Sequence, residues 1–241
     1  MNLANLESRV LVNAIAPKDI LASLYIFEGQ YLLRYQENDQ IFTKFISEEA
    51  VRNAFCHLPV DSGFLPTGIV RWGSTSKRTF IVKFICPASK NKVTFAGDTQ
   101  NQILSIPLPG LVLMGIGCQY FLWAVKTKQF DPNARVFHAP FPNINVSGGI
   151  CFGNNPVPDA SSKTIDLVWT LFGRSPFNGD TVAGKSKAFP SDIRKQLNDL
   201  HKQQKRSYPL RDLVDYSNRH KTIAEIIEFT IKSSYDSTTI N

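Results

Sequence analysis

Residues 138–155 combine a cysteine with a histidine, prolines, glycines and asparagines. Cys151 is the side chain in this stretch that is best suited to covalent chemistry, because a cysteine thiolate is a strong nucleophile. Proline, glycine and asparagine favour turns over regular helices or strands. We therefore predict a shaped loop in which Cys151 is the candidate chemical centre.

The residues before Cys151 fit an accessible, reactive thiol. Such a thiol must be reachable, and its thiolate must form near neutral pH. Gly148 and Gly149 keep bulk away from it and give the loop freedom to turn its N–H groups inward. When a thiolate attacks a carbonyl group, negative charge develops on the carbonyl oxygen, and nearby N–H groups or a side-chain amide would stabilise it.

The elements that must position this loop begin with short strands rich in β-branched and aromatic residues. They are predicted at residues 10–15, 20–27, 31–35 and 41–46. Ser47 is expected to cap a helix with Cys56 and His57 at the edge of its apolar face. A segment rich in proline and glycine, 59–68, is the expected hinge. We predict an N-terminal β-rich lobe with one helix over residues 1–64 and a second domain over residues 65–241.

The second domain is predicted to be α+β. Consecutive antiparallel strands of one central sheet are expected at residues 79–86, 92–95, 102–107, 111–116 and 120–126. Cys86 and Cys118 lie on or beside these strands and are expected to be small buried hydrophobes. Helices are predicted at 164–172, with Gly173 as the stop, from Ser191 and Asp192 onward, at 210–216 and at 223–231.

Composition narrows the class of protein. The four cysteines contain no Cys-x-x-Cys pair, so no structural metal is expected. No leader peptide or unbroken apolar span is found, which predicts a cytoplasmic protein with reduced thiols and no membrane partner. The formal charge is +7, and residues 192–221 hold eight Lys or Arg against four Asp. These basic helices are either a solvated surface or a docking surface, and no motif points to nucleic acid.

The loop residues resemble the active-site segment of a known enzyme family. Pro142-Asn143-Ile144 followed by Gly148, Ile150 and Cys151 resembles the active-site segment of ubiquitin-conjugating enzymes, where His-Pro-Asn precedes the thioester-forming cysteine. The eight-residue interval from Asn143 to Cys151 matches that of those enzymes. The chain is more closely similar to the prokaryotic ubiquitin-conjugating-enzyme-like family D, the protein B family of PRTRC systems. The motifs are Trp72-Gly73-Ser74-Thr75, Pro107-Leu108-Pro109-Gly110-Leu111, His138-Ala139-Pro140-Phe141-Pro142-Asn143, Cys151-Phe152-Gly153-Asn154 and Phe177-Asn178-Gly179.

The resemblance implies a ubiquitin-conjugating-like core in which Cys151 forms the thioester. It implies that Asn143 acts on the oxyanion or braces the loop, while closure of a turn is the plainer role for this residue. His138, Pro142, Gly148 and Gly149 would support the loop. The sequence departs from the better-known enzymes in two places.

Phe141 stands where those enzymes have the His of His-Pro-Asn. The residues after Cys151 lack the usual Leu-Asp. The acid that helps to deprotonate an acceptor is therefore unassigned, with Asp159 and Asp180 as candidates.

The resemblance also implies partners. They are a ubiquitin-like protein, an adenylating activating enzyme and a metallopeptidase-like protein of the same bacterial gene cluster, with the N-terminal lobe and the basic helices as docking sites. ATP would bind the activating enzyme, because this chain has no Gly-x-x-x-x-Gly-Lys loop, and no cofactor is expected. Two alternatives stay open: a noncatalytic scaffold of the same fold, and a cysteine hydrolase built from Cys151, His138 and an acid.

Overall fold

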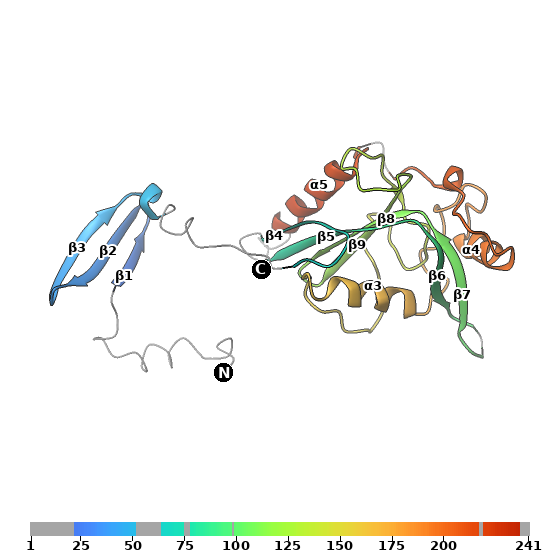
Figure 1. Cartoon of the computed structure of the whole chain (residues 1–241), viewed down its shortest axis with the longest axis horizontal. Helices are drawn as coiled ribbons and strands as arrows, with labels where there is room; N and C mark the ends of the chain where they lie inside the picture. The colour runs from blue at the N-terminus through green and yellow to red at the C-terminus, as the bar shows by residue number, and fades with distance from the viewer. Residues whose placement is uncertain (1–21, 52–63, 75–77, 98, 217–218, 237–241) are drawn as a thin grey trace. The chain divides into compact units, whose positions relative to one another are not determined.

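The computed structural model describes residues 22–51, 64–74, 78–97, 99–216 and 219–236. The chain divides into two units, Met1–Gly63 and Phe64–Asn241, which we describe separately. The structure is α+β, with antiparallel sheets and few helices (Figure 1), as the sequence predicts. The predicted strand at 10–15, Cys56, His57 and the first part of the predicted hinge lie outside the described residues.

The first unit contains a three-stranded antiparallel meander. Its strands are β1 (Ala22–Phe27), β2 (Gln30–Glu37) and β3 (Gln40–Ile46). Gly29 closes the first hairpin at φ +73°, and Asn38 and Asp39 close the second at φ 50° and 62°. Ser47 then accepts a hydrogen bond from the Ala50 N–H at 3.1 Å and caps a helix whose described part covers residues 48–51. That this region is an added lobe remains a prediction.

The second unit is built on a five-stranded antiparallel sheet with the order β10-β9-β8-β5-β4. The strands are β4 (Ile69–Ser74), β5 (Thr79–Ile85), β8 (Gly110–Ile116), β9 (Gln119–Val125) and β10 (Phe137–His138). All seven residues of β8, the central strand, are buried. A strand buried in this way requires that both faces of the sheet be covered.

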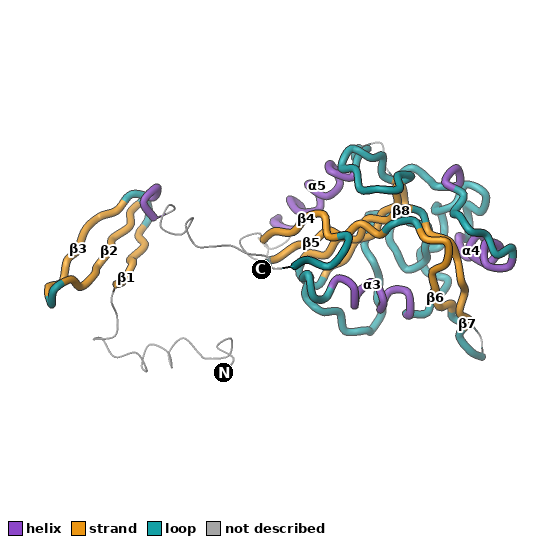
Figure 2. The backbone as a smooth tube through the Cα atoms, in the orientation of Figure 1, coloured by secondary structure: helices purple, strands orange, loops and turns teal. Residues whose placement is uncertain are grey.

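The prediction of one sheet of consecutive strands is wrong for two of them. β6 (Ala88–Phe95) and β7 (Gln102–Leu108) pair with each other in a separate two-stranded sheet. β5 leads into β6 through Pro87, and β7 leads into β8 through Pro109, so the two prolines stand at the same level of one long hairpin. Proline donates no backbone hydrogen bond, so the ladder breaks there. The β6–β7 ribbon therefore bends away from the sheet (Figure 2).

Helices cover the sheet on both faces (Figure 1). α3 (Ile165–Arg174) and α4 (Ile193–Lys202) join one apolar cluster, whereas α5 (Ile223–Asp236) joins the other. Successive residues of β8 alternate between the two, with Leu113 in the first cluster and Met114 in the second. The core is thus a sheet between two layers, and its α3 face packs beneath the candidate loop.

Gly173 does not end α3, contrary to prediction. The helix continues to Arg174, and the Ser175 N–H closes it by donating to the Leu171 carbonyl. A side chain at Gly173 would place its Cβ 3.3 Å from the carbonyl oxygen of Lys92. Close packing against β6, rather than termination, therefore explains this glycine.

The predicted helix at 210–216 is reduced to a single 3-10 turn, η3 (Leu210–Asp212). The residues after it use their backbone groups to extend the sheet. Val214 accepts a hydrogen bond from the His138 N–H at 3.0 Å, and the Tyr216 N–H donates to Val136 at 3.3 Å. Pairing beside β10 thus overrides the helical pattern.

Cys86 and Cys118 are exposed, which contradicts their prediction as buried residues. Cys86 stands at the bend before Pro87, and Cys118 lies in the turn between β8 and β9. The Cys118 thiol donates a hydrogen bond to the Asp159 carboxylate at 3.1 Å, and this bond raises the pKa of the thiol. Both positions lie just past the end of a strand, where alternation no longer determines burial.

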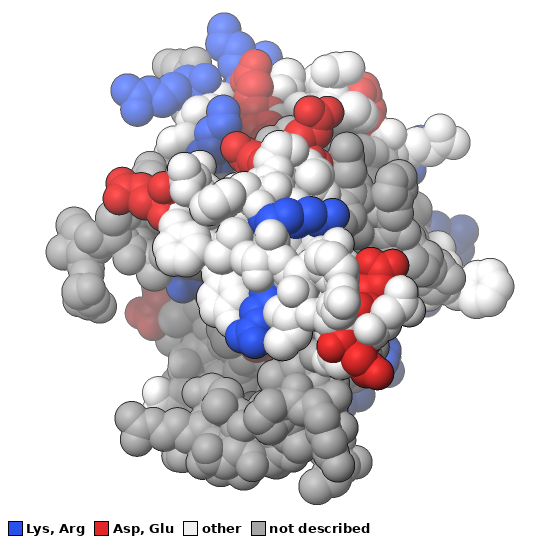
Figure 3. Space-filling view, turned by 90° about the vertical axis from the view of Figure 1, so that its left-hand side faces the viewer, with Lys and Arg blue, Asp and Glu red and all other residues white. Residues whose placement is uncertain are grey.

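Charged side chains of both signs are visible on one face of the molecule (Figure 3). Figure 3 shows a face on which acidic and basic side chains are interspersed among uncharged ones. Within the basic segment, Arg194 pairs with Asp192 at 2.8 Å, while Lys195 and Lys202 are exposed. No helix in the described ranges has the length and apolar character needed to cross a membrane.

Candidate active site

The loop that carries Cys151 is organised along the free edge of β9. β10 pairs with this edge, after which the chain leaves the sheet over residues 139–147. It returns to the same edge, where the Gly148 carbonyl accepts the Leu122 N–H and the Ile150 N–H donates to Tyr120, each at 2.8 Å. Both ends of the excursion are therefore fixed by strand-like hydrogen bonds.

Asn143 and Cys151 close the excursion at its base. The Cys151 N–H donates to the Asn143 carbonyl at 2.8 Å, and Ile144 forms an antiparallel bridge with Ile150. Asn143 has a left-handed backbone with φ 57°, which asparagine tolerates better than most residues. The eight-residue interval in the sequence is thus a turn whose two ends touch.

Asn145, which the sequence analysis missed, holds the tip of the loop. Its Oδ1 accepts hydrogen bonds from the Ser147 N–H at 3.0 Å, the Ser147 hydroxyl at 2.7 Å and the Gly149 N–H at 2.8 Å. A single amide oxygen therefore satisfies three donors of the turn. The sequence signal was an asparagine followed by serine and glycine, which is typical of a turn closed by the asparagine side chain.

Glycine is required at positions 148 and 149 because neighbouring side chains lie too close to the backbone to leave room for a Cβ atom. Gly148 has φ +87°, and a Cβ there would overlap the Trp123 indole nitrogen. A Cβ on Gly149 would lie 2.8 Å from the Asn145 side-chain nitrogen. The Gly148 N–H donates to the Asn145 carbonyl at 3.0 Å, and the Gly149 N–H to Asn145 Oδ1. These N–H groups hold the loop instead of pointing toward an incoming carbonyl.

The Cys151 side chain is exposed at the end of this fixed backbone. Phe152, the next residue, is buried and packs edge-on against Tyr120 and Phe172, with ring centroids 6.1 and 6.5 Å away. The thiol is therefore reachable from solvent, while the residues on both sides of it are anchored.

Phe141 and Pro142 anchor the other end of the turn. Both are buried, and the Phe141 ring packs against Phe172 and Phe177 at centroid distances of 5.7 and 6.0 Å. An aromatic ring at this position thus joins the loop to the core cluster beneath α3. A histidine at the same place would bring a polar ring into that cluster.

The Asn143 side chain faces the segment at Pro176. Its Nδ2 donates to the Pro176 carbonyl at 3.4 Å, and within the described residues its buried Oδ1 has no hydrogen-bond partner. The Asn143 N–H donates to the Asp180 carbonyl, also at 3.4 Å. This arrangement favours a bracing role over that of a free oxyanion donor.

The two candidate acids are placed differently. Asp180 lies beside the base of the loop through its contact with Asn143, and its carboxylate accepts a hydrogen bond from Asn178 Nδ2 at 2.7 Å. The Asp159 carboxylate is instead bonded to Cys118. The structure therefore brings Asp180 to the loop that carries Cys151.

His138 is the last residue of β10, at the point where the loop leaves the sheet. It is half-buried, and its ring lies 5.0 Å from the Tyr216 ring. Burial, followed by the charge of Lys185, lowers the pKa of His138. No hydrogen bond joins His138 to Cys151 in the described part of the chain, so the thiol–imidazole pair of a cysteine hydrolase is not formed here.

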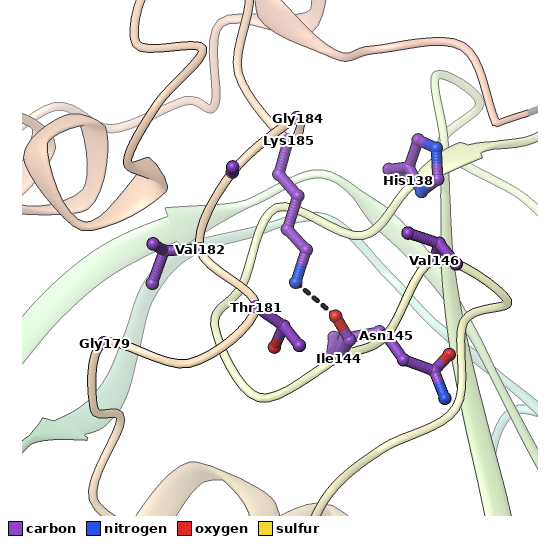
Figure 4. Close-up of a pocket in the computed structure, with 10 residues that line it drawn as sticks. His138, Ile144, Asn145, Val146, Gly179, Thr181, Val182, Gly184 and Lys185 are labelled. Carbon is purple, nitrogen blue, oxygen red and sulfur yellow. Dashed lines mark hydrogen bonds between the residues drawn. The ribbon is translucent and has the colours of Figure 1, made fainter.

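A buried lysine that the sequence analysis missed contacts the same turn (Figure 4). Lys185 is 4% exposed, and its Nζ donates to the carbonyl of Phe141 at 2.6 Å. It also donates to the carbonyl of Ile144 at 2.5 Å, which is the bond drawn in Figure 4. These carbonyls flank Pro142 and Asn143. Burial lowers the pKa of Lys185 to about 7. Lysine is rarely buried, so nothing in the sequence distinguished it from surface lysines.

A pocket of about 660 Å³ lies beside Lys185. It is lined by residues 144–146 of the loop, by residues 179–185 except Asp180, and by His138 (Figure 4). Among the residues that the structure describes, no three His, Cys, Asp or Glu side chains gather to hold a metal ion. The polar side chains that line the pocket are the imidazole of His138, the amide of Asn145, the hydroxyl of Thr181 and the amine of Lys185.

Comparison with known families gives a match over most of the chain. The family model described as prokaryotic E2 family D matches residues 42–216, which is more than half of the chain. The matched range begins in β3 and contains the whole loop together with Lys185. Neither the comparison with curated proteins nor that with solved structures gave a match.

The substitution Gly148→Ala is expected to lower the free energy of unfolding by about 3 kcal/mol, through overlap with Trp123 and left-handed strain. Gly153→Ala is the matched control, because Gly153 also has positive φ (+60°) but nothing lies within 4 Å of its Cβ. The control should lose only about 1 kcal/mol. Urea denaturation measures both, and equal losses would contradict the close approach at Trp123.

Raising the pH from 7 to 9 should stabilise the wild-type protein by about 2 kcal/mol more than Lys185→Met. The pKa of Lys185 is about 7 in the folded state against an ordinary 10.5, so between these values the unfolded chain binds more protons. The free energy of unfolding therefore rises with pH in the wild type, and methionine removes this contribution.

Urea denaturation of both proteins at both pH values gives the double difference, in which the titration of other groups cancels. The same pH dependence in both proteins would show that Lys185 titrates as an exposed lysine does.

Proposed function

The chain belongs to prokaryotic E2 family D, and from this membership we propose that it is a carrier enzyme that holds a ubiquitin-like protein as a thioester on Cys151. The observation that carries the proposal is the exposed Cys151 thiol, presented by a loop whose backbone is bonded on both sides. A carrier thiol must meet two large partners in turn, so exposure on a rigid support suits the task.

The proposed chemistry has two steps. In the first, the Cys151 thiolate attacks the thioester carbonyl carbon of the ubiquitin-like protein on its activating enzyme. A new carbon–sulfur bond forms to Cys151, and the sulfur of the activating enzyme leaves as a thiolate. In the second, an acceptor amine attacks the new thioester, gives up a proton and forms an amide as the Cys151 thiolate leaves.

Both steps develop negative charge on the carbonyl oxygen, which needs hydrogen-bond donors. The N–H groups of Gly148 and Gly149 already donate within the loop. The N–H groups of Phe152 and Gly153, directly after Cys151, have no acceptor within the described residues. These two are therefore our candidates for the oxyanion donors, and Asn143 is the candidate brace for the turn.

The proposal requires partners. They are a ubiquitin-like protein, an adenylating activating enzyme that uses ATP, and an acceptor amine, with a metallopeptidase-like protein of the same gene cluster as a further candidate. This chain needs no cofactor of its own for the two steps. Asp180 is our candidate for the carboxylate that assists deprotonation of the acceptor, because its segment contacts Asn143.

A noncatalytic scaffold for the activating enzyme or the ubiquitin-like protein is the alternative. The observation that favours it is that Asn143 Nδ2 and the N–H groups of Gly148 and Gly149 donate hydrogen bonds within the protein. A scaffold would keep full biological activity in a Cys151→Ser variant, whereas a carrier would lose it. A hydrolase is not proposed, because His138 is not bonded to Cys151.

The carrier function is tested by mixing the chain with its activating enzyme, the ubiquitin-like protein and ATP, followed by a non-reducing gel. We expect an adduct that thiol removes from the wild type and none from Cys151→Ala. Cys118→Ala is the matched control, because Cys118 is also exposed, and it should form the adduct normally. An adduct that persists in Cys151→Ala would disprove the mechanism.

Two substitutions of Asn143 separate bracing from oxyanion stabilisation. Asn143→Gly removes the amide but keeps the left-handed turn, whereas Asn143→Ala removes the amide and strains the turn by about 1 kcal/mol or more. For a brace, adduct formation by the alanine variant should be about tenfold slower than by the glycine variant. Equal losses of about 10²-fold in the two variants would instead assign the amide to the oxyanion.

A further inference from the structure

Lys185 takes no part in the two chemical steps, yet it is the most deeply buried charged group beside the loop. It is 4% exposed, and burial disfavours its ammonium form. In the described part of the chain, no carboxylate lies within ion-pair distance of it. The groups that receive its hydrogen bonds are backbone carbonyls of the loop.

The carbonyls of Phe141 and Ile144 face away from Cys151, on the opposite side of the turn from the Asn143 carbonyl that binds the Cys151 N–H. Along an extended segment, successive carbonyls point in opposite directions. The Asn143 carbonyl points toward Cys151 and accepts its N–H at 2.8 Å, whereas the next carbonyl, that of Ile144, points the other way and accepts from Lys185 Nζ at 2.5 Å. Lys185 also binds the Phe141 carbonyl at 2.6 Å, on the other side of the turn.

We propose that Lys185 is a positioning residue for Cys151: by binding the carbonyls of Phe141 and Ile144, it fixes the turn whose Asn143 carbonyl holds the Cys151 N–H. This inference rests on the proposed function of Cys151 and adds a residue that acts through the backbone. Without Lys185, two buried carbonyls would lose their donor, and the turn would rotate to find water.

The number of donors fits this role in both protonation states. An ammonium has three N–H groups, and a neutral amine still has two, which equals the number of carbonyls bound. His138, which lines the same pocket, is the titratable neighbour, and the side chain of Asn145 is uncharged. The two hydrogen bonds from Lys185 Nζ can therefore persist when Lys185 loses its proton, so the interaction does not imply a pH switch.

The test compares Lys185→Met with Lys187→Met, which makes the same change at an exposed lysine two residues along the chain. The first measurement needs no partner protein. Amide hydrogen exchange of the Cys151 N–H should become about tenfold faster in Lys185→Met, because the bond to Asn143 is loosened. Exchange in β8 should stay unchanged, and Lys187→Met should match the wild type at both places.

The second measurement uses the activating enzyme loaded with the ubiquitin-like protein. Lys185→Met should lower kcat for adduct formation about tenfold and leave KM unchanged, since the docking surface is intact. If Lys185→Met fails to fold, Lys185→Gln, which keeps two N–H donors on a shorter side chain, is measured in the same way. It should show a smaller change in Cys151 exchange and in kcat.

The outcomes separate the two proposals. A folded Lys185→Met with wild-type Cys151 exchange and wild-type kcat would overturn the positioning role. A wild-type chain that forms no adduct would overturn the carrier function, while faster Cys151 exchange in Lys185→Met would still establish that Lys185 fixes the turn.

Discussion

The backbone groups along the free edge of β9 must be paired, and the way in which the chain pairs them determines the shape of the site. β10 satisfies one end of the edge, and residues 148–150 satisfy the other. Because both ends of the intervening segment pair with β9, residues 139–147 must leave the sheet and return to it as a closed loop. Cys151 is exposed because it comes at the point where the returning chain leaves β9.

This excursion is held from three directions by different forces. Asn145 gathers the donors of its tip, Lys185 binds the carbonyls of its inner side, and Phe141 and Phe152 fix its two ends in the aromatic core. Two features of the excursion are unfavourable in themselves and, taken alone, would reduce the free energy of unfolding: burial of the Lys185 amine and the left-handed backbone of Asn143. The same interactions therefore serve stability and the presentation of the thiol.

The sequence predicted the parts of this arrangement that depend on local pattern. Runs of apolar residues located β8 and β9, and the prolines, glycines and asparagines of residues 138–155 predicted a shaped loop. It could not predict that the prolines at 87 and 109 meet at one level of a hairpin, since this depends on pairing between distant residues. Nor could it predict the burial of Lys185, because a lysine is buried only where several segments supply acceptors for its amine.

The covered edge of β9 has a consequence for solubility. Residues 120–125, Tyr-Phe-Leu-Trp-Ala-Val, are apolar and rich in β-forming side chains, and such a strand with an open edge invites pairing with another copy of the chain. The returning loop closes that edge. A substitution that disrupts the loop would therefore expose an aggregation-prone edge of β9 as well as displace the Cys151 thiol. Variants of this segment are best screened for aggregation before any loss of activity is interpreted.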